Sequence, residues 1–255
     1  MRAAASGTGN EAIWDEVENG SYSADLALWS SLAAARGPVL ELGCGGGRVT
    51  LALARLGHEV WGLDNERELT QALRERAEGE GLEVHVVEAD ARSFDLGREF
   101  GLVLAPMQFA HILGGSAARA SMLRAVRRHL APDARFAAAL LASRDQAETW
   151  QAPADVPLPD VRERDDWVFS SLPLSVVSDE TGLTIERLRQ VVSPSGKLTD
   201  ERHTVRLDAL EPEDFESEAR AAGLEPVARR EIPKTSDHAG STVVILRPAR
   251  AGSKR

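Results

Sequence analysis

Cysteine and long apolar runs are scarce in this sequence. Cys44 is the only cysteine among the 255 residues, so no disulfide can form within the chain. No apolar run approaches the roughly 18–20 residues that a membrane-spanning helix needs. The apolar part of residues 1–7 is also too short for a secretory signal. We therefore expect a cytoplasmic protein with no membrane partner.

Basic residues are also fewer than acidic residues in this sequence. The chain has 30 Lys and Arg against 40 Asp and Glu, which gives a formal net charge of −10 at pH 7. Nucleic-acid-binding proteins usually present a basic surface, so the composition argues against nucleic acid as a partner. The His, Cys and Asp residues form no cluster with metal-ligand spacing, which predicts a metal-independent protein. The length and the 43% hydrophobic content suit one α/β domain with an elaboration.

The strongest functional signal is the segment 39–49, in which an apolar run leads into a glycine-rich turn and then a helical pattern. Glycines let the backbone turn sharply and approach a ligand closely, and the N–H groups of a helix start favour an anionic group there. This order of strand, turn and helix predicts a nucleotide-type site. The dinucleotide fingerprint G-x-G-x-x-G would require a small third residue, however, and Arg48 stands at that position.

The order Glu41-x-Gly43-x-Gly45-x-Gly47 resembles the first motif of the class I S-adenosylmethionine-dependent methyltransferases. The resemblance covers residues 38–141 clearly and residues 211–246 more weakly. It implies S-adenosylmethionine as the cofactor and methyl transfer as the reaction. Acidic residues also follow the next two expected strands, and carboxyl ends of parallel strands form the ligand crevice of an open sheet.

The resemblance also implies a role for each of several residues. Glu41 and the glycine loop (Gly43, Cys44 and Gly45) would hold the methionine part, with Cys44 as a small loop residue rather than a nucleophile. Asp64, followed by Asn65, would bind the ribose hydroxyls. Asp90 would accept a hydrogen bond from the adenine amine, and the Ala91 backbone would reach a ring nitrogen. Tyr22, in an N-terminal helical segment, would belong to a lid over the cofactor, and Met107 would complete the cofactor site.

Strand-like and helix-like segments alternate through the middle of the chain, which predicts an α/β fold with a doubly wound parallel sheet. The expected strands of this sheet are residues 39–42, 59–63, 82–88, 100–105, 135–141, 224–232 and 242–246. The last two are joined like a hairpin and are therefore expected to be antiparallel. The resemblance implies seven strands in the order 3-2-1-4-5-7-6, with the last strand antiparallel.

Three further strand-like segments lie near residues 167–172, 183–192 and 202–210, after a proline-rich connection. They predict a small antiparallel sheet inserted into the main domain. We thus expect an N-terminal helical lid over 1–37, a Rossmann-like cofactor-binding domain formed by 38–142 and 211–248, and an inserted β segment over 143–210. The insert would cover the substrate or pair with its copy in a homodimer.

The segment after the fourth strand is where methyl acceptors lie in the resembled family. It reads Ala105-Pro-Met-Gln-Phe-Ala-His111 and lacks the Asn/Asp-Pro-Pro-aromatic pattern of enzymes that methylate base amines. This favours a small-molecule acceptor. His111 is a candidate general base or acceptor anchor, because its ordinary pKa lies near neutrality, although a core histidine would fit as well. Gln108 could orient the acceptor, and Trp14 could bind it or simply pack.

These observations favour an enzyme that transfers a methyl group from S-adenosylmethionine to an N or O atom of a small molecule. An NAD(P)-dependent oxidoreductase is an alternative, against which Arg48 and the antiparallel ending of the sheet argue. A non-catalytic S-adenosylmethionine-binding protein is another. It would have a plugged acceptor site beside residues 107–111, where an enzyme has an open one.

Overall fold

The computed structural model describes residues 11–34, 36–142, 150–151, 158–235 and 238–250. The chain divides into two compact units. The insert unit comprises residues 1–22 and 144–209, and the sheet unit comprises residues 23–143 and 210–255. Residues 23–34, which the sequence prediction grouped with the N-terminal lid, thus lie in the sheet unit. The function of residues 1–22 as a lid stays a prediction.

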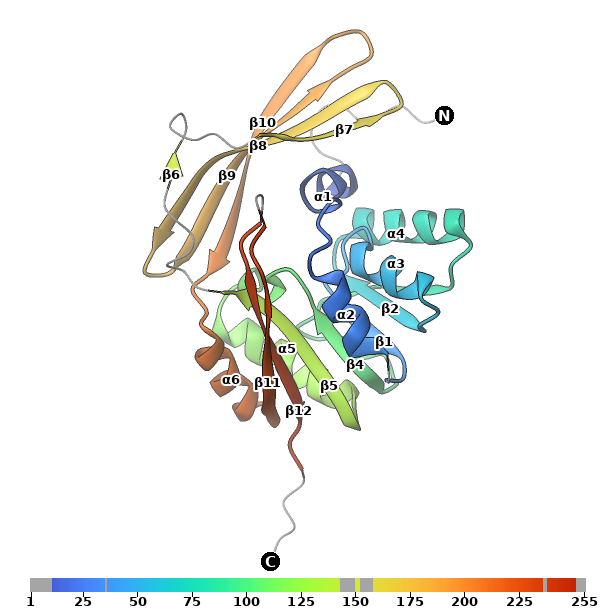
Figure 1. The fold of residues 1–255 in the computed structure, drawn as a ribbon, viewed down its shortest axis with the longest axis vertical. Coiled ribbons are helices and arrows are strands. Elements are labelled where there is room, and N and C mark those ends of the chain that lie inside the picture. Colours follow the sequence, from blue (N-terminus) through green and yellow to red (C-terminus); the bar gives the residue numbers. More distant parts are fainter. Residues whose placement is uncertain (1–10, 35, 143–149, 152–157, 236–237, 251–255) are drawn as a thin grey trace, which may run out of the picture. The chain divides into compact units, whose positions relative to one another are not determined.

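The sheet unit is built on one seven-stranded sheet (Figure 1). Its strands are β1 (Val39–Leu42), β2 (Val60–Asp64), β3 (Val84–Glu88), β4 (Phe100–Ala105), β5 (Leu130–Leu141), β11 (Leu224–Ile232) and β12 (Ser241–Pro248). Their order is β3-β2-β1-β4-β5-β12-β11, and β12 runs antiparallel to both of its neighbours. The predicted doubly wound α/β fold, its strand order and its antiparallel last strand are therefore confirmed.

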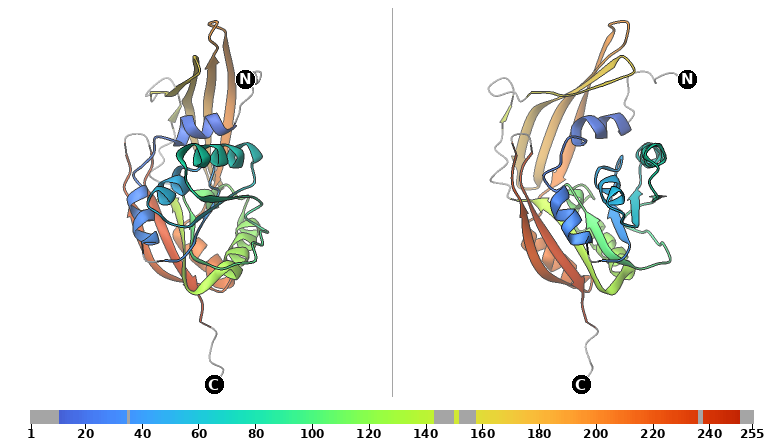
Figure 2. Two further views of the ribbon diagram at one scale, coloured as in Figure 1. Left: turned by 90° about the vertical axis from the view of Figure 1, so that its right-hand side faces the viewer. Right: turned by 45° about the vertical axis from the view of Figure 1, so that its right-hand side comes forward.

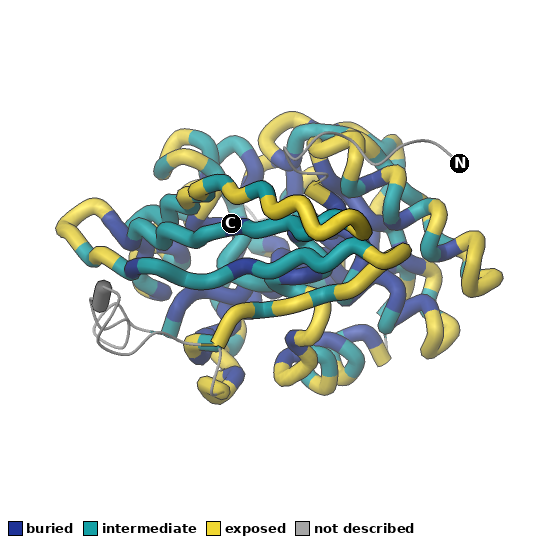
Figure 3. The backbone as a smooth tube through the Cα atoms, turned by 90° about the horizontal axis from the view of Figure 1, so that it is seen from above, coloured by how far each residue is buried: buried dark blue, intermediate teal, exposed yellow. Residues whose placement is uncertain are grey.

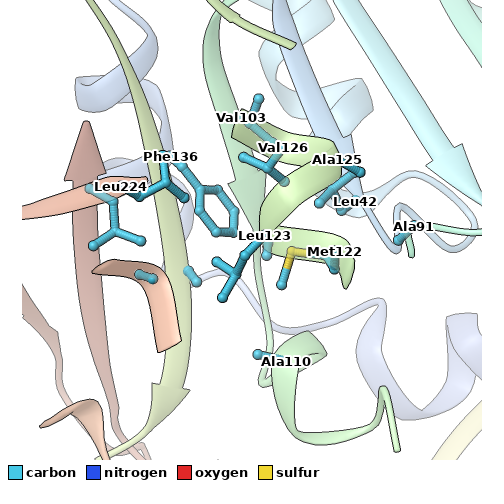
Figure 4. Close-up of a cluster of buried hydrophobic side chains, with 14 of the residues drawn as sticks. Leu42, Ala91, Val103, Ala110, Met122, Leu123, Ala125, Val126, Phe136 and Leu224 are labelled. Carbon is cyan, nitrogen blue, oxygen red and sulfur yellow. The ribbon is translucent and has the colours of Figure 1, made fainter. Parts of the chain in front are cut away.

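Helices cover both faces of this sheet (Figures 1 and 2). They are α2 (Leu26–Ala33), α3 (Arg48–Arg55), α4 (Arg67–Glu80), α5 (Ser116–His129) and α6 (Pro212–Ala221), with a short 3-10 helix η1 (Phe109–His111). Helices α5 and α6 share one hydrophobic core with the sheet, in which Leu42 and Phe136 of the strands meet Leu123 and Val126 of α5 (Figure 4). Alternate residues of β1 point to the opposite face, so Glu41 faces α3.

Two helices of the sheet unit begin without a side-chain cap. Gly115, with φ +92°, precedes Ser116, the first residue of α5. Helix α4 begins after Glu66. Asp64 accepts a hydrogen bond from the Glu66 N–H at 3.0 Å, and this leaves its carboxylate at the end of β2.

The insert unit contains helix α1 (Glu11–Asn19) and an antiparallel sheet (Figure 1). The strands are β6 (Trp150–Gln151), β7 (Asp160–Arg164), β8 (Trp167–Asp179), β9 (Gly182–Val192) and β10 (Leu198–Asp208). The three predicted strands are confirmed as β8, β9 and β10, and β6 and β7 join them. Exposed residues gather at the hairpin ends of these strands (Figure 3).

Strand β8 is longer than predicted because it continues past Pro173. A β-bulge between Pro173 and Ser175 shifts the register against β9 at this point. Proline has no N–H to donate to a neighbouring strand, and a bulge lets the ladder resume after it.

Helix α1 packs on the inserted sheet through aromatic and charged contacts. Trp14 meets the Phe169 ring edge-on, with 5.9 Å between ring centroids. Glu18 accepts hydrogen bonds from Arg189 at 2.8 and 3.0 Å and from Ser171 at 2.8 Å. These contacts hold α1 within the insert unit. Across the part of the chain that the structure describes, no helix is long and apolar enough to cross a membrane.

Candidate functional site

A pocket of about 190 Å³ opens in the sheet unit at the carboxyl ends of β1, β2 and β3. Five residues that the sequence assigned to the cofactor line it: Gly43, Asp64, Asn65, Asp90 and Ala91. The remaining lining residues are Leu63, Ala89, Arg92, Phe109, Ile112 and Leu113. The topology thus brings residues from three strand ends and from the segment after β4 to one place, as expected for an open parallel sheet.

The loop after β1 has a backbone that only glycine adopts without strain. Gly43, Gly45 and Gly47 have φ values of +65°, +53° and +96°. A Cβ atom on Gly43 would lie 2.3 Å from the Phe109 ring, and one on Gly47 would lie 2.3 Å from the Leu73 side chain. The glycines therefore let the loop pass directly beneath neighbouring side chains, one of which lines the pocket.

Cys44 turns away from the pocket. Its N–H donates to the Leu63 carbonyl at 3.0 Å, and its buried side chain packs with Leu51, Leu73 and Ala77. The structure therefore gives it the role of a small packed loop residue, and any cofactor contact from its backbone stays a prediction.

Asp64 connects the glycine loop to the start of α4. Its carboxylate accepts hydrogen bonds from the Gly45 N–H at 2.9 Å and from the Glu66 N–H at 3.0 Å, one on each oxygen. These bonds fix the orientation of the carboxylate, which is largely buried but reaches the pocket. A fixed carboxylate at the end of the second strand can accept hydrogen bonds from a pair of hydroxyl groups.

Asp90 is held by Arg92, which also lines the pocket. Its carboxylate accepts hydrogen bonds from the Arg92 backbone N–H at 2.8 Å, from Nε at 2.9 Å and from Nη2 at 2.5 Å. The guanidinium hydrogen bonds lower the pKa of Asp90 below its ordinary value, so this carboxylate is ionised at neutral pH.

Glu41 lies beneath the glycine loop rather than in the pocket lining. It is 3% exposed, and its carboxylate accepts a hydrogen bond from the Thr50 hydroxyl in α3. Loss of solvent raises the pKa of Glu41 to about 8, although the Thr50 bond and the charge of Arg48 act in the opposite direction. The predicted contact between Glu41 and the methionine part of the cofactor stays a prediction.

The segment after β4 has an unusual backbone. Met107 and Gln108 have φ values of +48° and +52°, in the left-handed region that non-glycine residues rarely adopt. The Gln108 amide donates to the Ser241 hydroxyl at 2.9 Å, so this side chain is engaged by the start of β12. Neither Met107 nor Gln108 lines the pocket, and their predicted contacts with cofactor and acceptor stay predictions.

His111 is deeply buried and bonded to the backbone. It is 2% exposed, and its Nε2 accepts a hydrogen bond from the Leu141 N–H at 3.1 Å. That bond assigns the neutral ring proton to Nδ1 and connects η1 to the end of β5. His111 therefore lies in the core with one ring nitrogen engaged, and its predicted role as general base or acceptor anchor stays a prediction.

Apolar residues of the same segment form one wall of the pocket, and the sequence analysis did not select them. Phe109, Ile112 and Leu113 are spaced by three and four positions, so one turn of chain presents all three together. This spacing of apolar residues directly after β4 is the sequence signal that could have predicted the wall. Phe109 is the most constrained of the three, because its ring lies against Gly43.

Trp14 and Tyr22 belong to the insert unit, and the pocket lies in the sheet unit. Trp14 packs against Phe169, which agrees with the packing interpretation of that residue. Its predicted role with the acceptor and that of Tyr22 as a lid residue stay predictions. Within the described residues, no group of three or more His, Cys, Asp or Glu side chains is arranged to hold a metal ion.

Comparison with known proteins finds one matching family and several solved structures of methyltransferases. The family of the methyltransferase domain matches residues 39–133, the span from β1 into β5 that contains the pocket. A search of curated proteins finds no match. Among solved structures, the chain is 26% identical to the CcbJ methyltransferase from Streptomyces caelestis, with 93% of this chain and 96% of that chain covered and a TM-score of 0.66.

Two other solved structures share the fold at lower identity. The sugar N-methyltransferase KedS8 from Streptoalloteichus sp. has 18% identity and a TM-score of 0.74, with 97% of this chain and 96% of that chain covered. CalS10 from Micromonospora echinaspora, an amino pentose methyltransferase, has 18% identity and a TM-score of 0.67, with coverage of 98% and 100%. Because coverage is nearly complete in both, the match includes the insert as well as the sheet.

Proposed function

Because residues 39–133 form a methyltransferase domain of the class I S-adenosylmethionine-dependent type, we propose that the protein methylates an amine nitrogen of a small molecule. One observation carries the proposal. A glycine loop and two oriented carboxylates, Asp64 and Asp90, line a single pocket at adjacent strand ends. The oxidoreductase alternative loses its support, because the loop has Arg48 where a dinucleotide fold needs a small residue.

The residues of the pocket fit the groups of S-adenosylmethionine. Asp64 would accept hydrogen bonds from the two ribose hydroxyls, and Asp90 from the adenine amine. The apolar wall of Phe109, Ile112 and Leu113 offers a surface for the flat adenine ring. The glycine loop, whose Gly43 lines the pocket, would lie along the methionine part, and its backbone carries no side chain there. When bound, S-adenosylmethionine supplies an electrophilic methyl group on a sulfonium.

Two arguments support an amine acceptor. A neutral amine already presents its lone pair, so the protein has to align it and exclude water and does not need a general base. His111, the predicted base, has its Nε2 engaged by the Leu141 N–H, which agrees with chemistry that does not use it. In addition, two proteins of this fold are described as a sugar N-methyltransferase and an amino pentose methyltransferase. An amino sugar is therefore the acceptor class to test first.

Calorimetric titration with S-adenosylhomocysteine, with NAD as the parallel control, tests the cofactor. We expect binding of the first and none of the second. Binding of NAD and not of S-adenosylhomocysteine would contradict the proposal and support the oxidoreductase alternative.

The acceptor is tested by incubating the protein and S-adenosylmethionine with matched pairs of sugars that carry either an amino or a hydroxyl group at the same carbon. Mass spectrometry is expected to detect one added methyl group on the amino sugars only. Transfer to the hydroxyl sugars alone would contradict the choice of nitrogen. Cofactor binding without any transfer, across amine acceptors of varied size, would favour a non-catalytic binding protein.

A further inference from the structure

Arg92 stands out among the pocket residues because it is a charged side chain that the cofactor assignment leaves without a role. It lines the pocket together with Asp90, two positions earlier in the chain. Its side chain is 51% exposed and that of Asp90 is 37% exposed. An exposed ion pair contributes little to folding stability, so stability alone gives a weak reason for this arrangement.

The turn that carries the pair restricts it more than a simple surface ion pair. The Ser93 N–H donates to the Asp90 carbonyl at 3.0 Å, and the Arg92 N–H donates to Asp90 Oδ1 at 2.8 Å. The guanidinium then closes on both carboxylate oxygens through Nε and Nη2. Backbone and side chain of one residue thus hold the same carboxylate, which leaves it little freedom to rotate.

Arg92 donates to both oxygens of Asp90. Its backbone N–H and Nε–H donate to Oδ1, and Nη2 and the same Nε–H donate to Oδ2. Because one N–H is shared between the two oxygens, three N–H groups face about four acceptor positions. The orientation that Arg92 gives the carboxylate therefore decides where a donor from the pocket can meet it.

We propose that Arg92 is a positioning residue that aims Asp90 at the exocyclic amine of the cofactor's purine ring and so selects adenine. The inference rests on the proposed function, in which this pocket binds S-adenosylmethionine. An amine at position 6 of the ring donates to the carboxylate, whereas a carbonyl oxygen at that position would meet it lone pair to lone pair. A site built to bond a donor discriminates strongly against an analogue without it.

The chain offers a matched control in Arg55 and Glu80. This pair is also bidentate, at 2.6 and 2.7 Å, and its side chains are 52% and 39% exposed. Neither residue lines the pocket. Arg55→Ala therefore removes an equally exposed ion pair without touching the site.

The test compares the affinity of the full chain for S-adenosylhomocysteine and for S-inosylhomocysteine, which carries a carbonyl in place of the amine. We expect the wild type and Arg55→Ala to favour the first ligand, and Arg92→Ala to lose about tenfold of that preference, because its carboxylate is no longer held. Arg92→Lys should restore only part of the preference, since lysine cannot form the bidentate pair. Asp90→Asn should lose the preference, because an amide can pair with either ring.

Each other result has a definite meaning. An unchanged preference in Arg92→Ala, or equal weakening of both ligands, would overturn the positioning role while leaving the proposed function intact. Tighter binding of S-adenosylhomocysteine to Arg92→Ala would also overturn it, since Arg92 would then compete with the adenine for Asp90. Failure of the wild type to bind S-adenosylhomocysteine would overturn the proposed function first, and the inference with it.

Discussion

Asp25 accepts two hydrogen bonds from Arg48, at 2.6 Å on one carboxylate oxygen and 2.7 Å on the other. Asp25 is 1% exposed and also accepts a bond from the Trp29 indole at 2.8 Å. Arg48 is the first residue of α3 and directly follows the glycine loop. The pair therefore connects the start of α2 to the loop that shapes the pocket, through two charges that are both withdrawn from water.

Removing one member of this pair should be costly, because it leaves the other charge buried without its partner. We expect Asp25→Ala to lower the free energy of unfolding by about 3–5 kcal/mol. Arg247→Ala is the control in the same unit. It breaks the exposed pair with Glu225 and should cost less than about 1 kcal/mol. Chemical denaturation followed by circular dichroism measures both. Equal losses of unfolding free energy in Asp25→Ala and Arg247→Ala would mean that water screens the pair of Asp25 and Arg48 as it screens an exposed pair.

Glu41 should make stability depend on pH. The pKa of this buried carboxyl is raised from 4.5 to about 8 in the folded protein, chiefly by loss of solvent. Between these values the unfolded chain ionises while the folded chain does not, so stability falls as pH rises. Glu41→Gln keeps an acceptor for Thr50 and cannot ionise. We expect the variant to gain stability relative to wild type as the pH rises from 4.5 to about 8. Urea unfolding of both proteins at these two pH values measures the difference. If the free energies of unfolding of variant and wild type differ by the same amount at both pH values, the pKa of Glu41 is not raised in the folded protein.

Gly43→Ala should abolish binding of S-adenosylhomocysteine while the sheet remains folded. The added methyl group would lie 2.3 Å from the Phe109 ring, at a backbone φ of +65° that disfavours alanine. The Phe109 ring, which lines the pocket, must then shift and change the shape of that wall. Calorimetric titration measures the loss. Phe109→Ala in the same chain should recover part of the affinity, because it removes the collision but not the backbone strain. No recovery would assign the whole effect to the backbone.

Asp64→Ala is expected to weaken S-adenosylhomocysteine binding by about a hundredfold. Two hydrogen bonds to a charged acceptor contribute about 1.5 kcal/mol each, and loosening of Gly45 adds to their loss. Glu88→Ala is the control, since Glu88 is exposed at the end of the neighbouring strand and does not line the pocket. Titration of both variants decides the assignment. A similar affinity in the two would remove Asp64 from the ribose site.

His111→Ala should affect stability more than turnover. The substitution leaves the Leu141 N–H without its acceptor and opens a cavity, so we expect a loss of about 2 kcal/mol in the free energy of unfolding. The rate per folded molecule should stay within about threefold of wild type. A general base would instead contribute about a hundredfold or more, with a changed pH profile. Turnover at several pH values, corrected for the folded fraction, separates these outcomes.

The sequence predicts the sheet well because the signals for it are local. Apolar runs mark β1, which ends before Gly43, and β4, which ends before Pro106, and the alternation in residues 202–207 marks the half-buried strand β10. The family resemblance, which rests on the glycine spacing and on the acids at strand ends, likewise predicts five of the pocket residues. Each of these features depends on neighbours within a few positions along the chain.

What the sequence could not predict depends on distant partners. Gln108 and Ser241 are 133 positions apart, and nothing local indicates that the amide is engaged by β12. The engagement of His111 by the Leu141 backbone is hidden for the same reason. The apolar wall of the pocket was overlooked because Phe109, Ile112 and Leu113 resemble ordinary core residues. Only the fold places them beside the strand ends.

The position of β12 has a consequence for protein synthesis. This strand comes last in the described chain, yet it lies between β5 and β11 in the interior of the sheet. A nascent chain therefore cannot complete the sheet until residues up to Pro248 have left the ribosome. Until then the long edge of β5 has no partner on that side, and β11 has no strand to join it to the rest. A premature stop before Ser241 would remove an inner strand of the sheet, and the truncated chain would be a substrate for proteases and chaperones.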